Sequence, residues 1–360
     1  MSRDLWVEVD TSALKHNFKQ VRAAVDPKVK IMAVVKGNGY GHGIAGAAKV
    51  FAECGADMLG VTRPEEAKAI RKAGVDTPIL VFLPVAEEDI REAADMNLTL
   101  TVTSLDMAKA IEKAGRPVDV HIKVDTGMGR LGVLPEDALP LAEYVSKSEL
   151  LTLGGVYTHF ADASAKKIDY TKRQFFTFLT VLDSFRRAKI DCGLAHAATS
   201  AAAMRLPESH LDMVRIGTLL YGQQPVKEGK RLDLKTTWAL KARICDIKTV
   251  KAGGKIGYGC EFTAKKDTKV GVVGVGYADG FAVSPMSVMY RQSPLAFLIR
   301  KMRYKPALTY RGKKLPVLGR VGMQISMVDL TRAGKAQIGD EVTVPARRIS
   351  TSPEIERIYK

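Results

Sequence analysis

The sequence contains few of the residues that crosslink small folds or bind metals. Its 360 residues include four cysteines and two tryptophans. Cys54, Cys192, Cys245 and Cys260 form neither a C-x-x-C pair nor a cluster with histidines at metal-ligand spacing. We therefore expect reduced thiols and no metal site.

Long apolar runs are absent as well. No stretch approaches the ~20 apolar residues that span a bilayer. The first residues carry Asp4, Glu8 and Asp10 and no apolar core segment, so they do not have the pattern of a signal peptide. These absences predict a cytoplasmic protein without membrane contact.

Negative charge is scarce relative to positive charge. The chain has 55 Lys and Arg against 39 Asp and Glu, a formal net charge of +16. Such an excess can indicate nucleic acid or an anionic membrane as a partner. Much of it falls in residues 300–305 and 311–314, where neither a groove of stacking aromatics nor a nucleic-acid motif accompanies it. We interpret these stretches as a solvated face and expect no nucleic-acid partner.

The length and the 46% hydrophobic content suit one large domain and a smaller one. In residues 28–220, short apolar runs alternate with segments whose apolar residues recur at helical spacing. Eight strands, each followed by a helix, predict an α/β fold of the (β/α)8 barrel type. The predicted strands are 29–35, 58–61, 78–82, 98–102, 118–124, 151–157, 194–196 and 212–215. The predicted helices include 13–25, 44–53, 64–72, 87–95, 104–113, 135–146 and 170–187.

After Leu232 the pattern changes to runs rich in Val, Ile and Thr, separated by glycines. Helical periodicity is nearly absent there, which predicts a smaller, mainly β domain. We place the barrel domain at 11–232 and the β domain at 233–360. Residues 5–9 alternate like a strand, and we expect them to pair with the β domain.

The most informative segment is Ile31–Gly43, with the sequence IMAVVKGNGYGHG. Its apolar run indicates a buried parallel strand that ends at Lys36, and the carboxyl ends of such strands carry the chemistry of α/β folds. A partly desolvated lysine there is a competent amine for Schiff-base formation. The glycines allow close approach of a ligand, and Tyr40 adds a hydroxyl. The alternative is a lysine that extends into solvent.

Seven separated motifs resemble, in order, those of the alanine racemase family, and they span nearly the whole chain. They are VKGNGYGHG at 35–43, KVDTGMGRLG at 123–132, YTHFA at 157–161, MVRIG at 213–217, GYG at 257–259, GYADG at 276–280 and GRVGM at 319–323. The resemblance implies a pyridoxal 5'-phosphate enzyme that is built from a barrel and a β domain. It also implies an isomerase that makes D-alanine for a bacterial type of cell wall, acting as a homodimer with shared active sites.

The resemblance also implies residue roles. Lys36 would hold the cofactor, and Lys36 and Tyr258 of a second subunit would be the two bases that racemisation needs on opposite faces. Arg215 would face the pyridine nitrogen, which an arginine cannot protonate. The phosphate would be held by Tyr40, Ser200, Gly217 and Thr218, and His159 would pack on the cofactor ring.

Further implied roles concern the substrate. Arg130 would bear on the substrate carboxylate and the cofactor's phenolic oxygen, Met323 would offer its amide to that carboxylate, and Tyr277 would lie in the entry channel. Lys123, which we expect on the same strand as Arg130, matches a lysine that is carbamylated in many relatives. If it is not modified, a buried lysine there needs an acidic neighbour.

Three features depart from the family pattern. Gly322-Met323-Gln324-Ile325 stands where the family has Cys-Met-Asp-Gln, so an amide replaces a carboxylate at the site entrance. An inserted stretch, 283–308, predicts an arm at the dimer surface or over the entrance, with contact to a membrane surface as the alternative. The short C-terminus offers no tyrosine that we can assign to the phosphate.

Two alternatives to an alanine racemase stay open. Gln324 and the inserted stretch are compatible with a racemase of another amino acid, such as serine or a basic one. A carrier that binds pyridoxal phosphate without turnover is the second alternative, although the β domain with Tyr258 counts against it.

Overall fold

The computed structural model describes residues 4–283, 299 and 305–360, which divide into two compact units. One unit is Thr11–Thr237, and the other combines the residues up to Asp10 with Trp238–Lys360. The inserted stretch expected to form an arm lies mostly outside the described residues. No described helix has the length and apolar content of a membrane span. All four cysteines are free thiols, as predicted.

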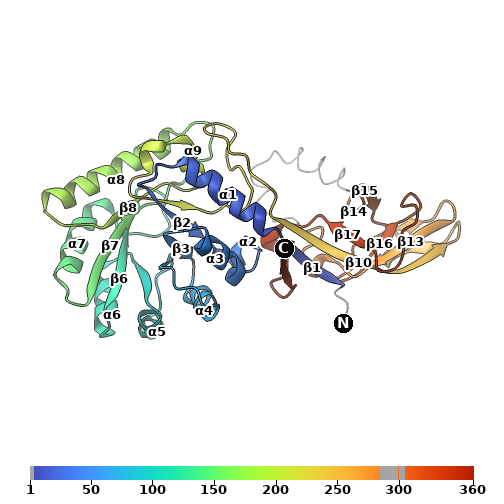
Figure 1. Ribbon diagram of the computed structural model, residues 1–360, viewed down its shortest axis with the longest axis horizontal. Helices are drawn as coiled ribbons and strands as arrows, with labels where there is room; N and C mark the ends of the chain where they lie inside the picture. Colours follow the sequence, from blue (N-terminus) through green and yellow to red (C-terminus); the bar gives the residue numbers. More distant parts are fainter. Residues whose placement is uncertain (1–3, 284–298, 300–304) are drawn as a thin grey trace. The chain divides into compact units, whose positions relative to one another are not determined.

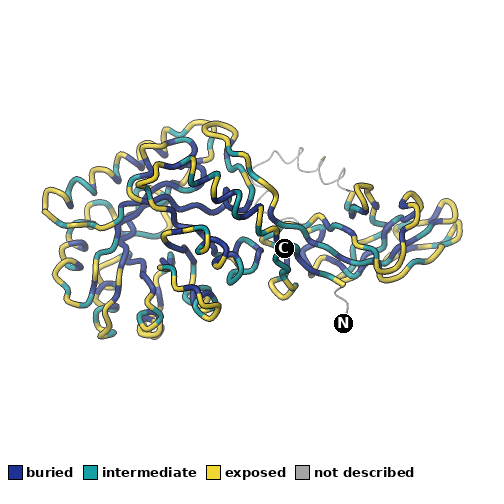
Figure 2. The backbone as a smooth tube through the Cα atoms, viewed as in Figure 1, coloured by how far each residue is buried: buried dark blue, intermediate teal, exposed yellow. Residues whose placement is uncertain are grey.

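The larger unit is a nearly closed barrel. Across residues 11–237, all of them described, eight parallel strands follow the order β8-β7-β6-β5-β4-β3-β2-β9. The strands are β2 (Lys30–Val34), β3 (Met58–Val61), β4 (Ile79–Val81), β5 (Leu98–Val102), β6 (Val118–Lys123), β7 (Leu151–Tyr157), β8 (Leu194–His196) and β9 (Met213–Ile216). Their almost continuous burial is that of a parallel sheet covered on both sides, and it appears as dark blue strands in Figure 2. The predicted barrel is confirmed.

The barrel closes between its first and last strands in the sheet order. A parallel bridge joins Thr199 to Arg215, and the Arg215 amide donates to the Ala198 carbonyl at 2.9 Å. The Asp212 amide donates to the Ala195 carbonyl at 3.0 Å, while its carboxylate accepts from the Ala195 amide at 2.8 Å. Arg215 therefore lies at the seam where the sheet meets itself.

Helices lie outside the ring of strands (Figure 1). The longer helices carry an apolar stripe for the sheet; in α3, for example, Ala47, Ala48 and Phe51 are buried. The helices of this unit are α1 (Thr11–Ala24), α2 (Lys36–Tyr40), α3 (Ile44–Glu53), α4 (Pro64–Lys72), α5 (Ile90–Asp95), α6 (Leu105–Lys113), α7 (Ala138–Lys147), α8 (Asp169–Arg187) and α9 (Ser200–Arg205). Short 3-10 turns cover 87–89, 135–137 and 207–209.

One expectation about the helices is wrong. β9 is not followed by a helix within residues 217–237. Instead α1, which precedes β2, holds this segment through the buried Asn17. The Asn17 side chain donates to the carbonyls of Leu220 at 3.2 Å and Lys235 at 2.9 Å, and it accepts from the Lys235 amide at 2.8 Å.

The second unit is mainly β, as predicted. Its described strands are β1 (Leu5–Val9), β10 (Trp238–Val250), β11 (Lys255–Ile256), β12 (Phe262–Thr263), β13 (Thr268–Val273), β14 (Ala307–Tyr310), β15 (Lys313–Pro316), β16 (Ser326–Asp329), β17 (Glu341–Val344) and β18 (Arg357–Tyr359). Its 3-10 turns cover 258–260, 277–279 and 348–350.

The long strand β10 organises this unit. Its first half pairs antiparallel with β1 and β17, and after an irregularity between Ile244 and Asp246 its second half pairs with β13. One strand thus pairs with both parts of the sheet. β1 also pairs in parallel with β18, which brings both chain ends together.

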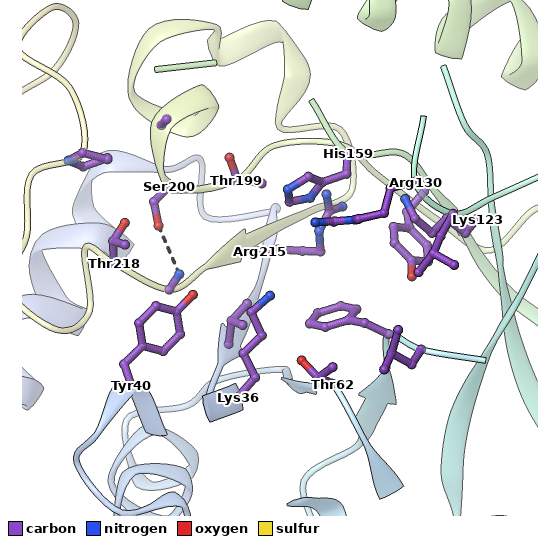
Figure 3. Close-up of a pocket in the computed structure, with 18 of the residues that line it drawn as sticks. Lys36, Tyr40, Thr62, Lys123, Arg130, His159, Thr199, Ser200, Arg215 and Thr218 are labelled. Carbon is purple, nitrogen blue, oxygen red and sulfur yellow. Dashed lines mark hydrogen bonds between the residues drawn. The ribbon is translucent and has the colours of Figure 1, made fainter. Parts of the chain in front are cut away.

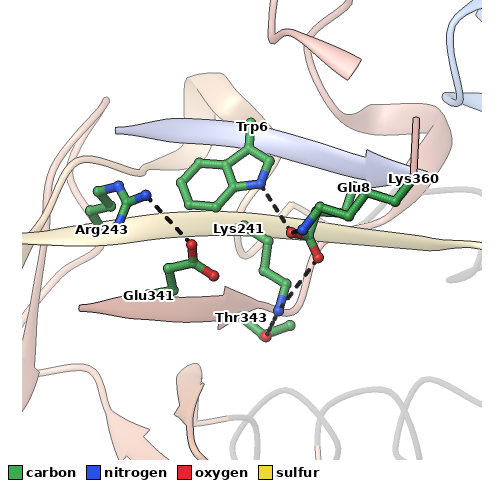
Figure 4. A network of polar contacts seen from close by, with 7 residues as sticks. All are labelled: Trp6, Glu8, Lys241, Arg243, Glu341, Thr343 and Lys360. Carbon is green, nitrogen blue, oxygen red and sulfur yellow. Dashed lines mark hydrogen bonds and ion pairs between the residues drawn. The ribbon is translucent and has the colours of Figure 1, made fainter. Parts of the chain in front are cut away.

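Charged side chains join the strand faces around β1 (Figure 4). Glu8 accepts from the Trp6 indole at 3.4 Å, pairs with Lys241 at 3.8 Å and contacts Lys360. The Arg243 guanidinium lies 5.2 Å from the Trp6 ring and pairs with Glu341 at 3.5 Å. Glu8 therefore ties together β1, β10 and the last residue of the chain.

Replacing Asn17 by alanine will destabilise the barrel unit. The change leaves two carbonyls and one amide of the 220–235 segment without the Asn17 side chain as partner, so we expect the free energy of unfolding to fall by about 3 kcal/mol. Urea unfolding followed by circular dichroism measures it. Lys19→Ala, an exposed position on the same helix, is the control, and equal stability of the two variants would contradict the role of Asn17.

Candidate active site

A cavity of about 670 Å³ lies at the carboxyl ends of the barrel strands. The predicted barrel residues all line it: Lys36, Tyr40, Lys123, Arg130, His159, Ser200, Arg215, Gly217 and Thr218. They come from the ends of several strands and the loops that follow, and Figure 3 shows the Lys36, Arg215 and His159 side chains converging on one space. This is the usual place for barrel chemistry.

Lys36 follows β2 and opens a short turn of left-handed backbone. Gly37, Asn38, Gly39 and Tyr40 have φ of 64°, 54°, 63° and 52° in succession. Glycine adopts such angles freely and asparagine tolerates them, whereas Tyr40 costs about 1–2 kcal/mol. The turn is closed by hydrogen bonds from the Gly39 amide to the Val35 carbonyl at 2.8 Å and from the Gly43 amide to the Asn38 carbonyl at 2.9 Å. The glycines predicted to permit close approach are thus needed for the backbone path itself.

The Lys36 amine lies among apolar and positive groups. Its Nζ is 5.8 Å from the centre of the Phe82 ring. Burial lowers the pKa of this amine, Arg130 and Arg215 lower it further, and only Glu66 acts in the opposite direction. A lowered pKa increases the fraction of neutral, nucleophilic amine near neutral pH.

Tyr40, Ser200 and Gly217 shape a small cup at one end of the cavity. The Gly217 amide donates to Ser200 Oγ at 3.1 Å, and a Cβ at Gly217 would lie 2.4 Å from Tyr40 Oη. The Tyr40 ring stacks on the buried Tyr221 ring at 4.8 Å between centroids. A side chain at position 217 would fill the cup, so glycine keeps hydroxyls and backbone accessible to a ligand.

Arg215 is buried, and most of its donors are used by the barrel. One terminal nitrogen donates to Nδ1 and to the carbonyl of His196, both at 2.9 Å. The other donates to the carbonyls of Thr158 at 2.6 Å and Ala197 at 3.0 Å. Burial lowers the pKa of Arg215 to about 10, so the guanidinium stays charged at neutral pH. Within the described residues, only its Nε–H is left for another acceptor.

Two histidines continue from Arg215 into the barrel interior. Because a guanidinium only donates, His196 Nδ1 must accept and its proton must sit on Nε2. That nitrogen lies 2.9 Å from His121 Nδ1, so His196 donates to His121. Burial and the charge of Arg215 lower the pKa of His121 to about 3 and that of His196 far below its ordinary value. Both rings are therefore neutral.

Lys123 is the most deeply buried amine of the cavity, with 4% of its surface exposed. Its Nζ lies 4.9 Å from the centre of the Tyr157 ring, and no described residue pairs with it or hydrogen-bonds to it. Burial first, and then the charges of Arg215 and Arg130, lower the pKa of Lys123 to about 7 despite the opposing charge of Asp125. A large share of this amine is neutral at physiological pH.

Arg130 lies in the loop after β6. The prediction that it shares a strand with Lys123 is wrong, because β6 ends at Lys123. The Asp125 carboxylate folds this loop by accepting from the amides of Gly127 at 2.9 Å, Met128 at 2.8 Å, Gly129 at 3.1 Å and Arg130 at 3.2 Å. Burial raises the pKa of Asp125, but these four amides outweigh it and the net pKa is lowered. Asp125 is thus occupied by the loop and is not the acidic partner that an unmodified Lys123 requires.

His159 follows β7 and lines the cavity. Burial and four surrounding cations, Arg215, Lys123, Arg130 and Lys36, lower its pKa to about 2. Its ring is neutral and is suited to packing against a flat ligand.

The residues around the cavity carry an unbalanced charge. Two lysines and two arginines line it, and no carboxylate does among the described residues. The described residues also contain no group of three or more His, Cys, Asp or Glu placed to hold a metal ion. The cavity favours a ligand with phosphate or carboxylate groups, whose charge the protein itself does not supply.

Three predicted residues belong to the β unit. Tyr258, Met323 and Tyr277 are 77%, 60% and 50% exposed. Their loops are adjacent, since the Tyr277 amide donates to the Gly322 carbonyl at 3.1 Å and the Ala278 amide donates to the Met323 carbonyl at 3.0 Å. A Cβ at Gly257 would lie 3.7 Å from the Arg320 amide nitrogen, which places the Tyr258 turn beside the same loops.

Several cavity residues were not anticipated from the sequence. Thr62, Phe82, Leu83, Leu131, Tyr157 and Thr199 also line the cavity. Tyr157 and Thr199 follow or end predicted strands, which was an available signal. Phe82 ends the predicted strand at 78–82 and Leu83 follows it, so the same signal was available for these two residues.

Two family models cover the chain. The model of the alanine racemase N-terminal domain matches residues 9–225, and that of the alanine racemase C-terminal domain matches residues 237–359. The alanine racemases of Methanococcus maripaludis and Desulforamulus reducens are both 40% identical to the chain. Each alignment covers 96% of this chain, with 89% and 90% of the relative.

Solved structures of alanine racemases have the same fold as this chain. The alanine racemase of Clostridium difficile superposes with a TM-score of 0.90 at 28% identity, covering 100% of this chain and 96% of that one. The alanine racemase of Bacillus anthracis with bound L-Ala-P superposes with a TM-score of 0.82 at 31% identity, covering 99% and 88%.

Acid will destabilise the protein partly through His159. Its pKa is about 2 in the fold against about 6.5 when exposed, so between these values the unfolded chain binds one proton more and stability falls as the pH falls. His159→Asn should reduce the slope of unfolding free energy against pH by about 1 kcal/mol per unit between pH 6.5 and 4.5. Urea titrations across this range measure it. Ser164→Ala, an uncharged change in the same cavity, should leave the slope as in the unmodified protein, and an unchanged slope in His159→Asn would refute the argument.

Proposed function

The chain belongs to the alanine racemase family, and we propose that it interconverts L- and D-alanine with pyridoxal 5'-phosphate bound in the barrel cavity. The observation that carries this proposal is a cavity lined by two arginines and two lysines of lowered pKa, with no carboxylate among the described lining residues. A phosphorylated cofactor and a substrate carboxylate would bring the charge that this cavity lacks.

The residues present fit this cofactor. The Lys36 amine is suited to bind an aldehyde covalently. The cup offers the hydroxyls of Tyr40 and Ser200 to a phosphate, next to the Gly217 amide that donates to Ser200 Oγ. Thr218 would add a further hydroxyl. Arg215 retains one N–H for the ring nitrogen, and neutral His159 would pack on the ring.

When bound, pyridoxal phosphate supplies an electron-withdrawing ring that stabilises the negative charge at the substrate Cα. Arg215 limits that withdrawal, because it only donates and cannot transfer a proton to the ring nitrogen at neutral pH. This limit set by Arg215 would favour racemisation over transamination and decarboxylation.

Inversion at Cα requires proton transfer on both faces. Lys36 Nζ would hold a proton on one face, and Tyr258 Oη of a second copy would hold one on the other. Arg130 would orient the substrate carboxylate, and the Met323 amide of the second copy would bind it as well, with Tyr277 at the entrance.

Because these roles are assigned to residues of two copies, they imply a homodimer with shared sites. The exposed Tyr258, Tyr277 and Met323 support it, because aromatic residues and methionine are enriched at interfaces and are seldom left solvated together. In a dimer, each β unit would complete the cavity of the other chain.

Lys123 would act as a carbamate. A neutral amine can add CO₂ and release a proton, and the pKa of about 7 makes much of this amine neutral. The carbamate anion would pair with Arg130 and remove the cost of a buried, unpartnered ammonium.

Tyr258→Phe separates an enzyme from a carrier. The variant lacks the phenolic proton, so racemisation should fall by about 10²–10⁴-fold while the absorbance of bound pyridoxal phosphate persists. Lys36→Ala is the control that should lose the covalent cofactor signal. A wild-type protein that binds the cofactor but racemises nothing in a chiral chromatographic assay would establish the carrier alternative.

Alanine should be the preferred substrate in a panel of L-amino acids. The alternative, a racemase of another amino acid, rests on Gln324. This residue places a neutral amide where the family pattern has a carboxylate. We expect kcat/KM for alanine to exceed that for serine and arginine by about tenfold or more. Gln324→Asp tests whether the entrance charge contributes, and faster turnover of serine or arginine by the unmodified protein would overturn the preference.

A further inference from the structure

Glu66 links the lysine-bearing turn to a neighbouring strand end. One carboxylate oxygen accepts from the Gly37 amide at 2.7 Å, directly after Lys36. The other accepts from the amides of Thr62 at 2.7 Å and Arg63 at 3.3 Å, which begin the loop between β3 and α4. Thr62 itself lines the cavity. A single side chain therefore bridges two walls of the site.

The local sequence explains why this carboxylate is available. Glu66 is the third residue of α4, after Pro64 at the first position, and a carboxylate there is stabilised by the free amides of the helix N-terminus. In an ordinary capping arrangement both oxygens serve their own helix. Here one oxygen is used outside the helix, on the turn of residues 37–40.

That turn needs external support. Its four successive left-handed residues include Tyr40, whose side chain disfavours this backbone. The Lys36 side chain is carried on the first residue of this turn, so the path of the turn determines where the amine lies. Holding the Gly37 amide fixes that path at the peptide next to the lysine.

We propose that Glu66 is a positioning residue for Lys36, holding the turn that carries the amine and setting a negative charge beside it. The proposal rests on the proposed function, in which this amine condenses with an aldehyde. The neutral amine adds to the aldehyde carbon, and the carbonyl oxygen leaves as water. No redox step is involved.

Among the charges that shift the pKa of the Lys36 amine, that of Glu66 acts in the opposite direction to the others. Arg130 on the loop after β6 and Arg215 on β9 both disfavour the ammonium form of Lys36, as does burial, and Glu66 favours it. Lys123 at the end of β6 adds a further amine, and His159 after β7 is neutral. Removing the carboxylate charge should lower the pKa of the Lys36 amine further.

The experiment follows covalent capture of pyridoxal 5'-phosphate by the full-length apoprotein. The rate of the absorbance change is measured against pH for the unmodified protein, Glu66→Gln, Glu66→Asp and Glu65→Gln. Glu65→Gln is the matched control, because it removes the same charge from the neighbouring, exposed position of the same helix turn. The titrations of the aldehyde itself are common to all four proteins and cancel in the comparison.

Glu66→Gln keeps one acceptor oxygen but no charge. Its rate profile should keep its shape, with the acidic midpoint displaced to lower pH, because more of the amine is neutral at a given pH. Glu66→Asp keeps the charge but shortens the reach to Gly37, so the plateau rate should fall by about tenfold with the midpoint near that of the unmodified protein. Glu65→Gln should match the unmodified protein in both respects.

Two results would overturn the proposal. The first is a folded Glu66→Gln variant whose midpoint coincides with that of Glu65→Gln, since a merely structural carboxylate would change only the plateau. The second, decisive if Glu66→Gln does not fold, is a Glu66→Asp variant with an unchanged plateau. Failure of the unmodified protein to capture the aldehyde is a separate outcome, which would refute the proposed function on which this inference depends.

Discussion

The cavity concentrates positive charge without a counterion of its own, and the arrangement of the site follows from this imbalance. Lys36, Lys123, Arg130 and Arg215 are held together by a barrel whose strands are fixed by their hydrogen bonds. The protein tolerates the repulsion in two ways. Burial and mutual repulsion make the amines easier to deprotonate, and every nearby histidine stays neutral. Binding of an anion in the cavity relieves the remaining repulsion among these positive charges, and this relief favours binding.

The acidic residues near the site are engaged in shaping loops. Asp125 accepts hydrogen bonds from four backbone amides and so orders the glycine-rich loop that carries Arg130. Glu66 accepts from the Gly37 amide in the turn after Lys36. Neither residue is among those that line the cavity. The two carboxylates thus maintain geometry from behind the cations that face the ligand.

Much of the barrel could be predicted from the sequence, because its strands are apolar runs and its helices have clear periodicity. The strands at 58–61, 98–102, 151–157 and 194–196 and the helices at 44–53 and 64–72 have the predicted bounds. The short strands β11, β12, β14 and β18 were not predicted, since they are defined by their pairing with other strands and not by an apolar run of their own. The roles of Glu66, Asp125 and His121 depend on contacts that spacing does not reveal. His121 and His196, for example, are 75 positions apart.

The polar chain that leads from Arg215 into the barrel has a fixed direction. Its first member can release no proton at neutral pH and accepts none, so the tautomers of His196 and His121 are locked behind it. A proton wire conducts only if every link can reverse its hydrogen bond, and this one cannot reverse at its first link. The chain from Arg215 to His121 therefore passes no proton between the cavity and the barrel interior.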